Sequence, residues 1–219
     1  MFLLKDKKNT KGPCRNGGGL KERVQVIFQY HRIVLRLKPH CFILKLILYW
    51  SFFVPDKRFL IFFFRQVRRN DTGRFVKEFP FISPCGKELN FIRGDDYPTV
   101  YTNLSTKSSH KTLEPEEHLC YGHTGDVLSV PFEPNKIFMA ESGRVYHPAP
   151  DRVGGIGLIS SKLAIELSKF FAFKGSGNSP THFEWLGTTY ELDTEWYNKA
   201  RDEHRKFMER AEELNSKKQ

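Results

Sequence analysis

The sequence predicts an α+β fold, with one or more antiparallel twisted sheets covered by two helices and followed by a solvated C-terminal helix. Short strand-like segments follow one another between residues 74 and 147. Their connections are too short for parallel crossovers, which need a dozen or more residues. Helical periodicity is confined to residues 58–68, 158–173 and the charged segment after Thr194. Such separation of helices from an antiparallel sheet defines the α+β class.

The first elements follow from local periodicity. A helix is expected over residues 58–68, since Phe59, Phe62 and Phe63 recur at i, i+3 and i+4. Residues Ser83–Gly86 have the composition of a tight turn, with Pro at the second position and Gly at the last. Alternating side chains predict three short strands around this turn, at 74–82, 89–93 and 99–104.

The second half continues with strands and then a helix. Residues 105–117 are polar without a period and are expected to form a surface loop. Apolar segments predict a hairpin from 119–121 and 127–132 and strands at 136–139 and 144–147, and the clearest helix is expected at 158–173, capped by Ser160 or Ser161. A last hairpin over 181–192 turns at Gly187. Residues 55–192 are therefore assigned to one domain, and 193–219 to a charged C-terminal helix.

The net charge of +10 belongs to the N-terminal part of the chain. Residues 1–75 hold 17 Lys and Arg against 4 Asp and Glu, whereas residues 76–219 hold 18 against 21. A domain that binds nucleic acid through phosphates carries its basic charge on the fold itself. The sequence therefore has no specific nucleic-acid signal.

Residues 1–54 form an atypical basic and apolar segment. It is either a divergent, partly disordered start or sequence that does not belong to the natural protein. Within it, the longest charge-free run, Leu46–Val54, is shorter than the roughly 20 apolar residues of a spanning helix. Membrane contact is expected only if residues 24–54 are genuine.

Several motifs together resemble one eukaryotic family. They are Phe79–Gly86, Asn90-Phe91, Val130–Pro134, Gly143–Pro150 and Gly154–Leu158. In order and spacing, over about residues 56–185, the chain resembles the uncharacterised protein family 0598, which includes the chromosome 8 open-reading-frame 82 protein and its relatives. Cysteines without a pairing pattern are expected to be reduced thiols in an intracellular compartment. The resemblance adds a mitochondrial location for some members, and it implies no activity. Family members begin with an aromatic-rich hairpin and a short helix, which residues 1–54 do not match.

Four cysteines, Cys14, Cys41, Cys85 and Cys120, show no metal-ligand or redox spacing, so no metal and no cofactor are predicted. Cys85 lies before Gly86 on a predicted turn, where a nucleophile needs a nearby histidine. His147 and His123 are the candidates. The alternative, a small residue packed in a turn, is favoured over catalysis.

The glycine run Gly154, Gly155 and Gly157 precedes a predicted helix, and Ser160 stands where a dinucleotide fingerprint has its third glycine. Amides at a helix N-terminus can hold an anion. A flexible segment that lets the helix pack closely on the sheet is the favoured explanation.

Three further groups are weaker candidates. Asp95 and Asp96 could bind a metal, although a turn hydrogen bond explains them. Basic residues that could meet phosphate or lipid are Arg65, Arg68 and Arg69. Tyr146-His147-Pro148 is better explained as a strand end.

The leading hypothesis is a non-catalytic binding or scaffold protein of unknown partner, because turn and core motifs outnumber chemical ones. The first alternative is a small enzyme using Cys85 with His147 near the glycine run. The second is attachment to nucleic acid or a membrane surface through the basic N-terminus. A pocket shared by Cys85, His147 and Gly155 would favour the enzyme.

Overall fold

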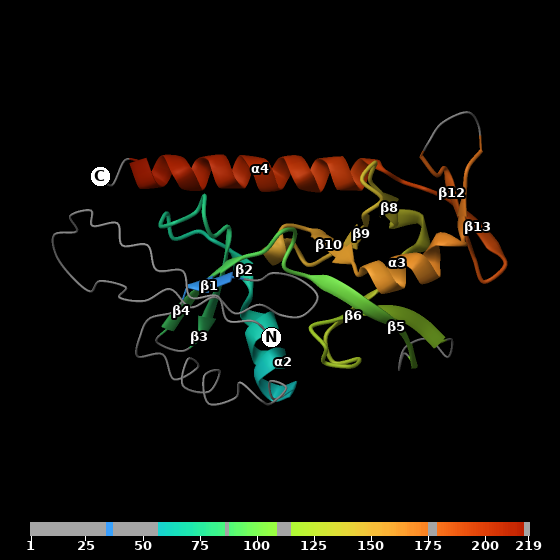
Figure 1. Cartoon of the computed structure of the whole chain (residues 1–219), viewed down its shortest axis with the longest axis horizontal. Coiled ribbons are helices and arrows are strands. Elements are labelled where there is room, and N and C mark those ends of the chain that lie inside the picture. Colours follow the sequence, from blue (N-terminus) through green and yellow to red (C-terminus); the bar gives the residue numbers. More distant parts are fainter. Residues whose placement is uncertain (1–33, 37–56, 86–87, 109–114, 175–178, 217–219) are drawn as a thin grey trace.

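The computed structural model describes residues 34–36, 57–85, 88–108, 115–174 and 179–216. It confirms the α+β class, and its C-terminal helix lies along one side of the molecule (Figure 1). Within the described residues, the strands form sheets of six, four and three strands. Apart from 34–36, the N-terminal segment and its membrane and nucleic-acid hypotheses lie outside the described residues.

The six-stranded sheet has the order β7-β6-β5-β10-β9-β8. Its strands are β5 (Val100–Ser108), β6 (Pro115–Tyr121), β7 (Ser129–Pro131), β8 (Phe138–Met139), β9 (Val145–Pro148) and β10 (Ile156–Ile159). The predicted antiparallel pairing is confirmed except at the centre, where β5 and β10 run parallel with Val100 opposite Leu158. The four strands between them serve as the long crossover that a parallel pair requires.

The four-stranded sheet has the order β1-β4-β3-β2, all antiparallel. Its strands are β1 (Val34–Arg36), β2 (Arg68–Arg69), β3 (Phe81–Cys85) and β4 (Glu88–Arg93). The predicted first helix is confirmed as α2 (Lys57–Gln66), which contacts β3. It buries Leu60 and Phe63, whereas Phe62 of the predicted face is 44% exposed, so the buried face is rotated from the one that the sequence predicts.

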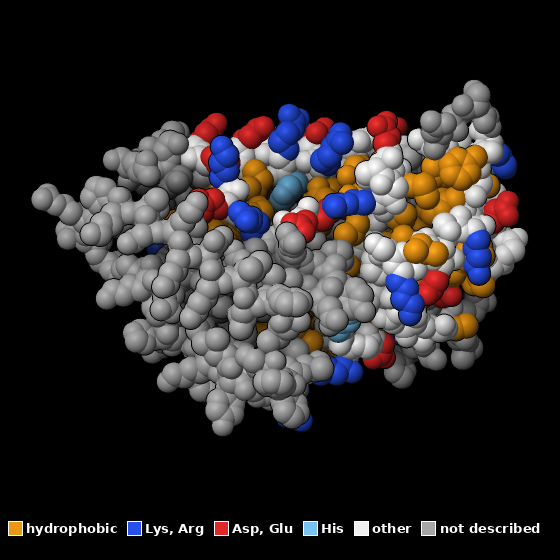
Figure 2. All heavy atoms as spheres, in the orientation of Figure 1, with side chains coloured by type: hydrophobic (Ala, Val, Ile, Leu, Met, Phe, Trp, Pro, Cys, Tyr) orange, Lys and Arg blue, Asp and Glu red, His pale blue; other side chains and the backbone are white. Residues whose placement is uncertain are grey.

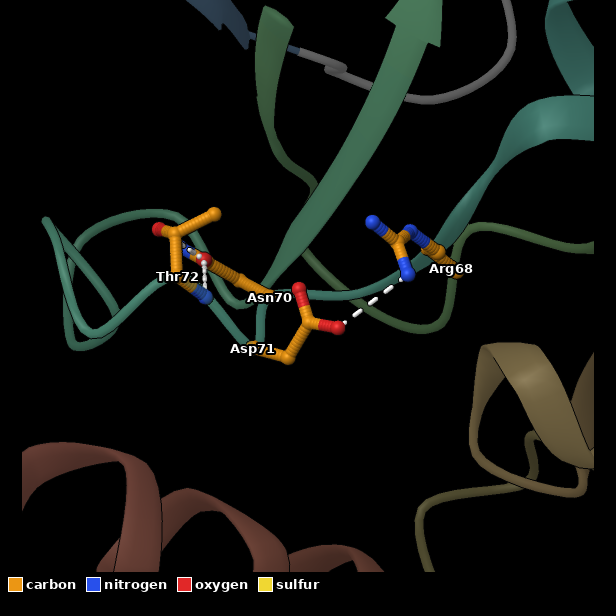
Figure 3. Close-up of polar contacts among 4 residues, drawn as sticks. All are labelled: Arg68, Asn70, Asp71 and Thr72. Carbon is orange, nitrogen blue, oxygen red and sulfur yellow. Dashed lines mark hydrogen bonds and ion pairs between the residues drawn. The ribbon is translucent and has the colours of Figure 1, made fainter. Parts of the chain in front are cut away.

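The buried Asn70 organises a compact turn ahead of β3. Its amide nitrogen donates to the carbonyls of Arg74 and Phe79, each at 2.9 Å. Its carbonyl oxygen accepts from the backbone and hydroxyl of Thr72, as Figure 3 shows for this pair. All of the polar capacity of this side chain is directed at its own loop, which fixes the loop's shape.

This turn makes the predicted strand at 74–82 wrong over most of its length, since β3 begins only at Phe81. Carbonyls bonded to a side chain cannot join a strand ladder, and the Phe79 amide bonds the Phe75 carbonyl at 2.8 Å instead. The rings of Phe75 and Phe79 both pack edge-on against Phe91. Their alternation in the sequence therefore reflects packing rather than a strand.

The predicted turn at Ser83–Gly86 is displaced, because β3 continues to Cys85, which pairs with Glu88 of β4. Pro84 lies inside the strand. It has no amide to donate, but β2 pairs only with the first two residues of β3, Phe81 and Ile82, so Pro84 stands beyond the reach of β2.

The predicted polar loop at 105–117 is wrong at both ends, where β5 and β6 extend as a hairpin. Lys107 pairs with Glu116 across the strands, and such opposite-charge pairs stabilise a sheet. The ammonium of Lys107 also donates to the Asp126 carbonyl and the Ser129 hydroxyl, each at 2.6 Å. A polar segment thus forms strands through pairing rather than apolar burial.

The predicted helix at 158–173 is shorter than expected. It forms α3 (Ser161–Ser168), and the residues before and after it belong to β10 and to β11 (Phe171–Ala172). Strand β10 is fully buried at the sheet centre, and an apolar run cannot by itself distinguish a buried strand from a helix. The predicted Ser160 cap is confirmed, since its hydroxyl accepts from the Leu163 amide.

The last hairpin is confirmed as β12 (His182–Trp185) and β13 (Thr188–Glu191), which join β11 in the three-stranded sheet. Trp185 pairs with Thr188, so the turn consists of Leu186 and Gly187. Phe183 is fully buried and joins the main core with Leu163 and Leu167 of α3. This hairpin therefore lies against the same core as α3.

The C-terminal helix α4 (Glu195–Ser216) links two sheets. Its Tyr197 stacks on Phe138 of β8, with ring centroids 4.0 Å apart, and His204 stacks on Phe81 of β3 at 5.5 Å. Its outward face carries alternating acidic and basic side chains (Figure 2). The predicted solvated helix is thus correct for the outer face, whereas the inner face forms packed aromatic contacts.

Candidate functional site

His147 on β9 is buried in the core, where both of its ring nitrogens form hydrogen bonds with the backbone. The Glu133 amide donates to its Nε2 at 3.0 Å, so Nδ1 carries the proton and donates to the Pro148 carbonyl at 3.1 Å. Its ring lies against those of Phe132 and Tyr101. Burial lowers the pKa of His147 to about 4, so it is neutral at physiological pH. It has the surroundings of a structural residue.

Cys85 lies in another sheet and another core cluster. It is buried at the end of β3 with Phe63 and Val153, and its Sγ is 3.7 Å from the Ser83 hydroxyl. That hydroxyl donates to the Phe63 carbonyl. The second candidate partner, His123, is exposed in the connection between β6 and β7. The structure thus places Cys85 in the four-stranded sheet and both histidines in the region of the six-stranded sheet.

The glycine run does not open a helix, because Gly157 lies within β10 and the rest of that strand leads to α3. Gly154 and Gly155 have φ angles of +100° and +75°, which L-residues rarely adopt. Their amides donate to the carbonyls of Asp151 and Pro150. Backbone donors that are used within a turn are not directed at a ligand.

Neighbouring side chains fill the space beside these glycines. A Cβ on Gly157 would lie 2.5 Å from the Tyr101 ring, and one on Gly154 would lie 3.1 Å from Nδ1 of His204 in α4. The run therefore allows close packing against α4 and Tyr101, whereas the sequence analysis expected it to let α3 pack closely on the sheet. Ser160 lies apart from it as the cap of α3.

Asp96 links a turn to β9. Its carboxylate accepts from the Tyr146 hydroxyl at 3.0 Å and from the Tyr97 amide at 2.8 Å, and it forms an ion pair with Arg144. Burial and the Asp96 charge raise the pKa of Tyr146 to about 12. Among the residues that the structure describes, no group of three or more His, Cys, Asp or Glu could hold a metal ion.

The basic residues near the end of α2 are engaged within the fold. Arg68 forms an ion pair with Asp71 at 3.1 Å, which is drawn in Figure 3, and the Arg69 guanidinium lies 4.6 Å from the ring centroid of Phe207 in α4. Arg65 is exposed. Two of the three side chains proposed for phosphate are therefore already in contact with neighbouring groups.

A groove of about 390 Å³ opens between β5, α3 and β12. We call it the Trp185 groove. It is lined by Asn103, Leu104, Leu163, Glu166, Leu167, Lys169, Phe170 and Trp185. Five of these residues are aliphatic or aromatic, and the other three supply one amide, one carboxylate and one ammonium. Ligand sites combine apolar contact, which gives affinity, with a few polar groups that give orientation, and both kinds of group line this groove.

Trp185 is held firmly in this groove. Its ring meets that of Phe170 edge to face, with centroids 4.7 Å apart, and that of Phe132 at 5.3 Å. The indole N–H donates to the Glu117 carboxylate on β6. Since the polar atom is already bonded, the indole offers its apolar surface to the groove.

The hairpin turn next to Trp185 has an unusual residue at its tip. Leu186 has a φ of +48° and its side chain is 80% exposed, and Gly187 follows with a φ of +78°. Two consecutive positive φ values indicate a type I′ turn, for which Asn-Gly is the preferred pair. Hydrophobic side chains are visible on this part of the surface, over α3 and the hairpin (Figure 2).

Sequence reasoning missed the groove. Most of its lining residues fall in the predicted helix at 158–173 and the predicted hairpin at 181–192, but nothing in the sequence joins these segments to Leu104. The dipeptide Leu186-Gly187, in place of Asn-Gly between two strands, was the available signal.

A model of the domain of unknown function DUF4505 matches residues 45–197, a range that includes residues 45–54 of the atypical N-terminal segment. No solved structure matches the chain. Among the described residues, no helix is both long enough and apolar enough to cross a membrane.

Proposed function

The chain belongs to the DUF4505 family, and on that premise we propose that it is a non-catalytic binding protein whose Trp185 groove receives an apolar side chain of a polypeptide partner. The observation that carries the proposal is the groove itself, whose lining combines five aliphatic or aromatic residues with three polar ones. The leucine and aromatic side chains in this lining favour an aliphatic or aromatic group. The amide, carboxylate and ammonium can bond a partner's backbone.

The lining of the groove supports binding rather than chemistry. Its eight residues include no cysteine, histidine or serine and only one carboxylate. Nucleophilic catalysis requires a nucleophile beside a base, and hydrolysis by paired carboxylates requires two. Cys85 and His147, on which the enzyme alternative depends, line neither the groove nor a common cluster.

Titration with N-acetyl-leucine amide and N-acetyl-tryptophan amide tests the proposal. We expect shifts in the NMR signals of the Trp185 indole and the Leu104 and Leu167 methyl groups, with a Kd of about 1 mM, typical of so small a ligand. N-acetyl-glutamine amide should bind much more weakly. Shifts that are absent, or spread evenly over the protein, would contradict a binding groove.

A pair of matched variants assigns the binding to the groove. Asn103→Trp places a large ring at its rim, whereas Asn198→Trp places the same ring on the exposed outer face of α4. Asn103→Trp should weaken binding of the leucine amide at least tenfold, and Asn198→Trp should leave it unchanged. Equal effects of the two would overturn the assignment.

The proposal extends to family and location. Membership in protein family 0598, and with it a mitochondrial location inside the cell, is supported by the motifs from Phe79–Gly86 to Gly154–Leu158. Fractionation of cells that express the natural protein, followed by protease protection of the mitochondria, tests the location. Recovery in the cytosol alone would contradict it.

A further inference from the structure

We propose that the partner received by the Trp185 groove is a second copy of this chain, with Leu186 of each copy entering the groove of the other. The inference rests on the proposed function, because it names the occupant of the same groove. It is carried by three features: a strained, exposed leucine, a groove lined in part by the residue next to it in the chain and by four other aliphatic or aromatic residues, and lining residues of both charges.

Leu186 is a poor choice for its own turn. A bulky L-residue at a φ of +48° is strained, and its side chain is 80% exposed to water. Asparagine would fit the same backbone and remove the exposed apolar surface. Neither the turn nor the core of the isolated chain explains a leucine here, whereas a contact that covers its side chain does.

The position of Leu186 next to the groove sets the symmetry of the contact. Leu186 directly follows Trp185, and Trp185 lines the groove with Lys169 and Phe170. The protruding side chain and the groove are therefore close together, because Leu186 and the groove-lining Trp185 are neighbours in the chain. A patch that carries both complementary parts pairs with itself around a two-fold axis, and the assembly closes as a dimer rather than a filament.

The rim charges favour a second copy over other partners. Glu166 and Lys169 stand three residues apart along α3 and the residues that follow it, and both line the groove. The Lys169 ammonium lies 4.9 Å from the Phe170 ring centroid, which keeps it at the rim. A two-fold axis can set Glu166 of each copy opposite Lys169 of the other. A partner with a surface of one sign would be repelled by one of the two residues.

Analytical ultracentrifugation of the full chain, over a range of concentrations from micromolar to millimolar, tests the inference. The wild-type chain should show a monomer–dimer equilibrium. Leu186→Asn should raise the dimer Kd at least tenfold while the melting temperature of the protein stays equal or rises, because Asn-Gly suits the turn. Val127→Asn, which replaces an exposed apolar residue between β6 and β7, is the matched control and should leave the Kd unchanged.

Mixing two variants tests the exchange of leucines directly. Leu186→Asn has a groove but no leucine to insert, and Asn103→Trp has the leucine but an obstructed groove. Each alone should have a dimer Kd at least tenfold above that of the wild-type chain, and their mixture should associate more tightly than either, because one leucine can still enter one open groove. A mixture that remains as dissociated as its components overturns the reciprocal contact.

The failures of the two proposals are distinguishable. A chain that is monomeric at all concentrations but binds N-acetyl-leucine amide in the groove overturns self-association and leaves the binding groove in place. A dimer that Leu186→Asn does not weaken also overturns the inference. A chain that neither dimerises nor binds the amide overturns both.

Discussion

The interior around His147 and the surface around Trp185 share one neighbour, Phe132, but they use their polar and apolar groups in opposite ways. Phe132 stacks on His147 and meets Trp185 edge to face. On the His147 side both ring nitrogens are bonded and the residue is 1% exposed. On the Trp185 side a groove opens and Leu186 projects into water.

The comparison separates residues that stabilise the fold, such as His147, from exposed residues that can contact another molecule, such as Leu186. A histidine with both nitrogens satisfied by backbone groups has no capacity left for a substrate. A leucine kept in an unfavourable turn contributes nothing to the isolated fold. The predictions that follow test this division, from the largest expected effect to the smallest.

Replacing His147 should be the most damaging change. His147→Ala removes a buried ring between Tyr101 and Phe132 and leaves the Glu133 amide unbonded, so the free energy of unfolding should fall by about 3 kcal/mol. Urea denaturation measures it. The control Ile165→Ala, at a site 73% exposed, should change it by less than about 0.5 kcal/mol. Similar losses of stability in both variants would contradict the view that His147 stabilises the fold and exposed residues do not.

Acid should lower the free energy of unfolding through the same residue, His147. The pKa of His147 is lowered to about 4 in the folded protein from its ordinary value of 6.5. The neutral form is thus favoured by folding, and the stability it provides is complete above pH 6.5 and is lost as the pH falls through 4. The loss amounts to about 3 kcal/mol.

Burial also lowers the pKa of His204, which therefore acts in the same direction. His147→Gln, compared with the wild type by urea denaturation at several pH values, should remove most of the dependence between pH 6.5 and 4. An unchanged slope in this variant would show that His147 is not the group responsible.

Two glycines distinguish interior packing from backbone strain. Gly157→Ala brings a Cβ to 2.5 Å from the Tyr101 ring and should lower the free energy of unfolding by about 2 kcal/mol. Gly143→Ala meets no atom within 4 Å, but its φ of +77° should cost about 1 kcal/mol. Thermal denaturation of both variants measures the difference. A larger loss at Gly143 would contradict the contact with Tyr101.

The smallest effect should be of the opposite sign. Leu186→Asn should raise the free energy of unfolding of the monomer by about 0.5 kcal/mol, because asparagine suits a type I′ turn. Urea denaturation at a concentration below the dimer Kd measures it. A loss of more than about 1 kcal/mol would show that Leu186 stabilises the isolated fold after all.

Elements with a local signal could be predicted from the sequence. The aromatic spacing of α2, the hairpin that turns at Gly187 and the Ser160 cap each depend on neighbours within a few residues. The shape of segment 74–80 could not be predicted, because the carbonyls of Arg74 and Phe79 accept from the side chain of Asn70 rather than from another strand. The strand Ile156–Ile159 could not be predicted either, since an apolar run becomes a strand here only through its pairing with β5 and β9.

The candidate site was harder to predict than the fold. The Trp185 groove combines residues near position 103, residues 163–170 and residue 185, and no periodicity relates them. The residues singled out for chemistry were chosen by type, whereas their roles depend on burial and on hydrogen-bond partners. His147 and Gly157 are both explained by packing against Tyr101.

The parallel pairing of β5 with β10 has a consequence for how the chain folds. It joins Val100 to Leu158 at the centre of the largest sheet, so this contact has a long sequence separation and forms slowly. During synthesis, β5 is complete well before β10 leaves the ribosome, and until then one edge of β5 lacks its partner. An unpaired edge invites association with other chains. The nascent protein therefore passes through a stage that is vulnerable to aggregation, and chaperones would be most useful there.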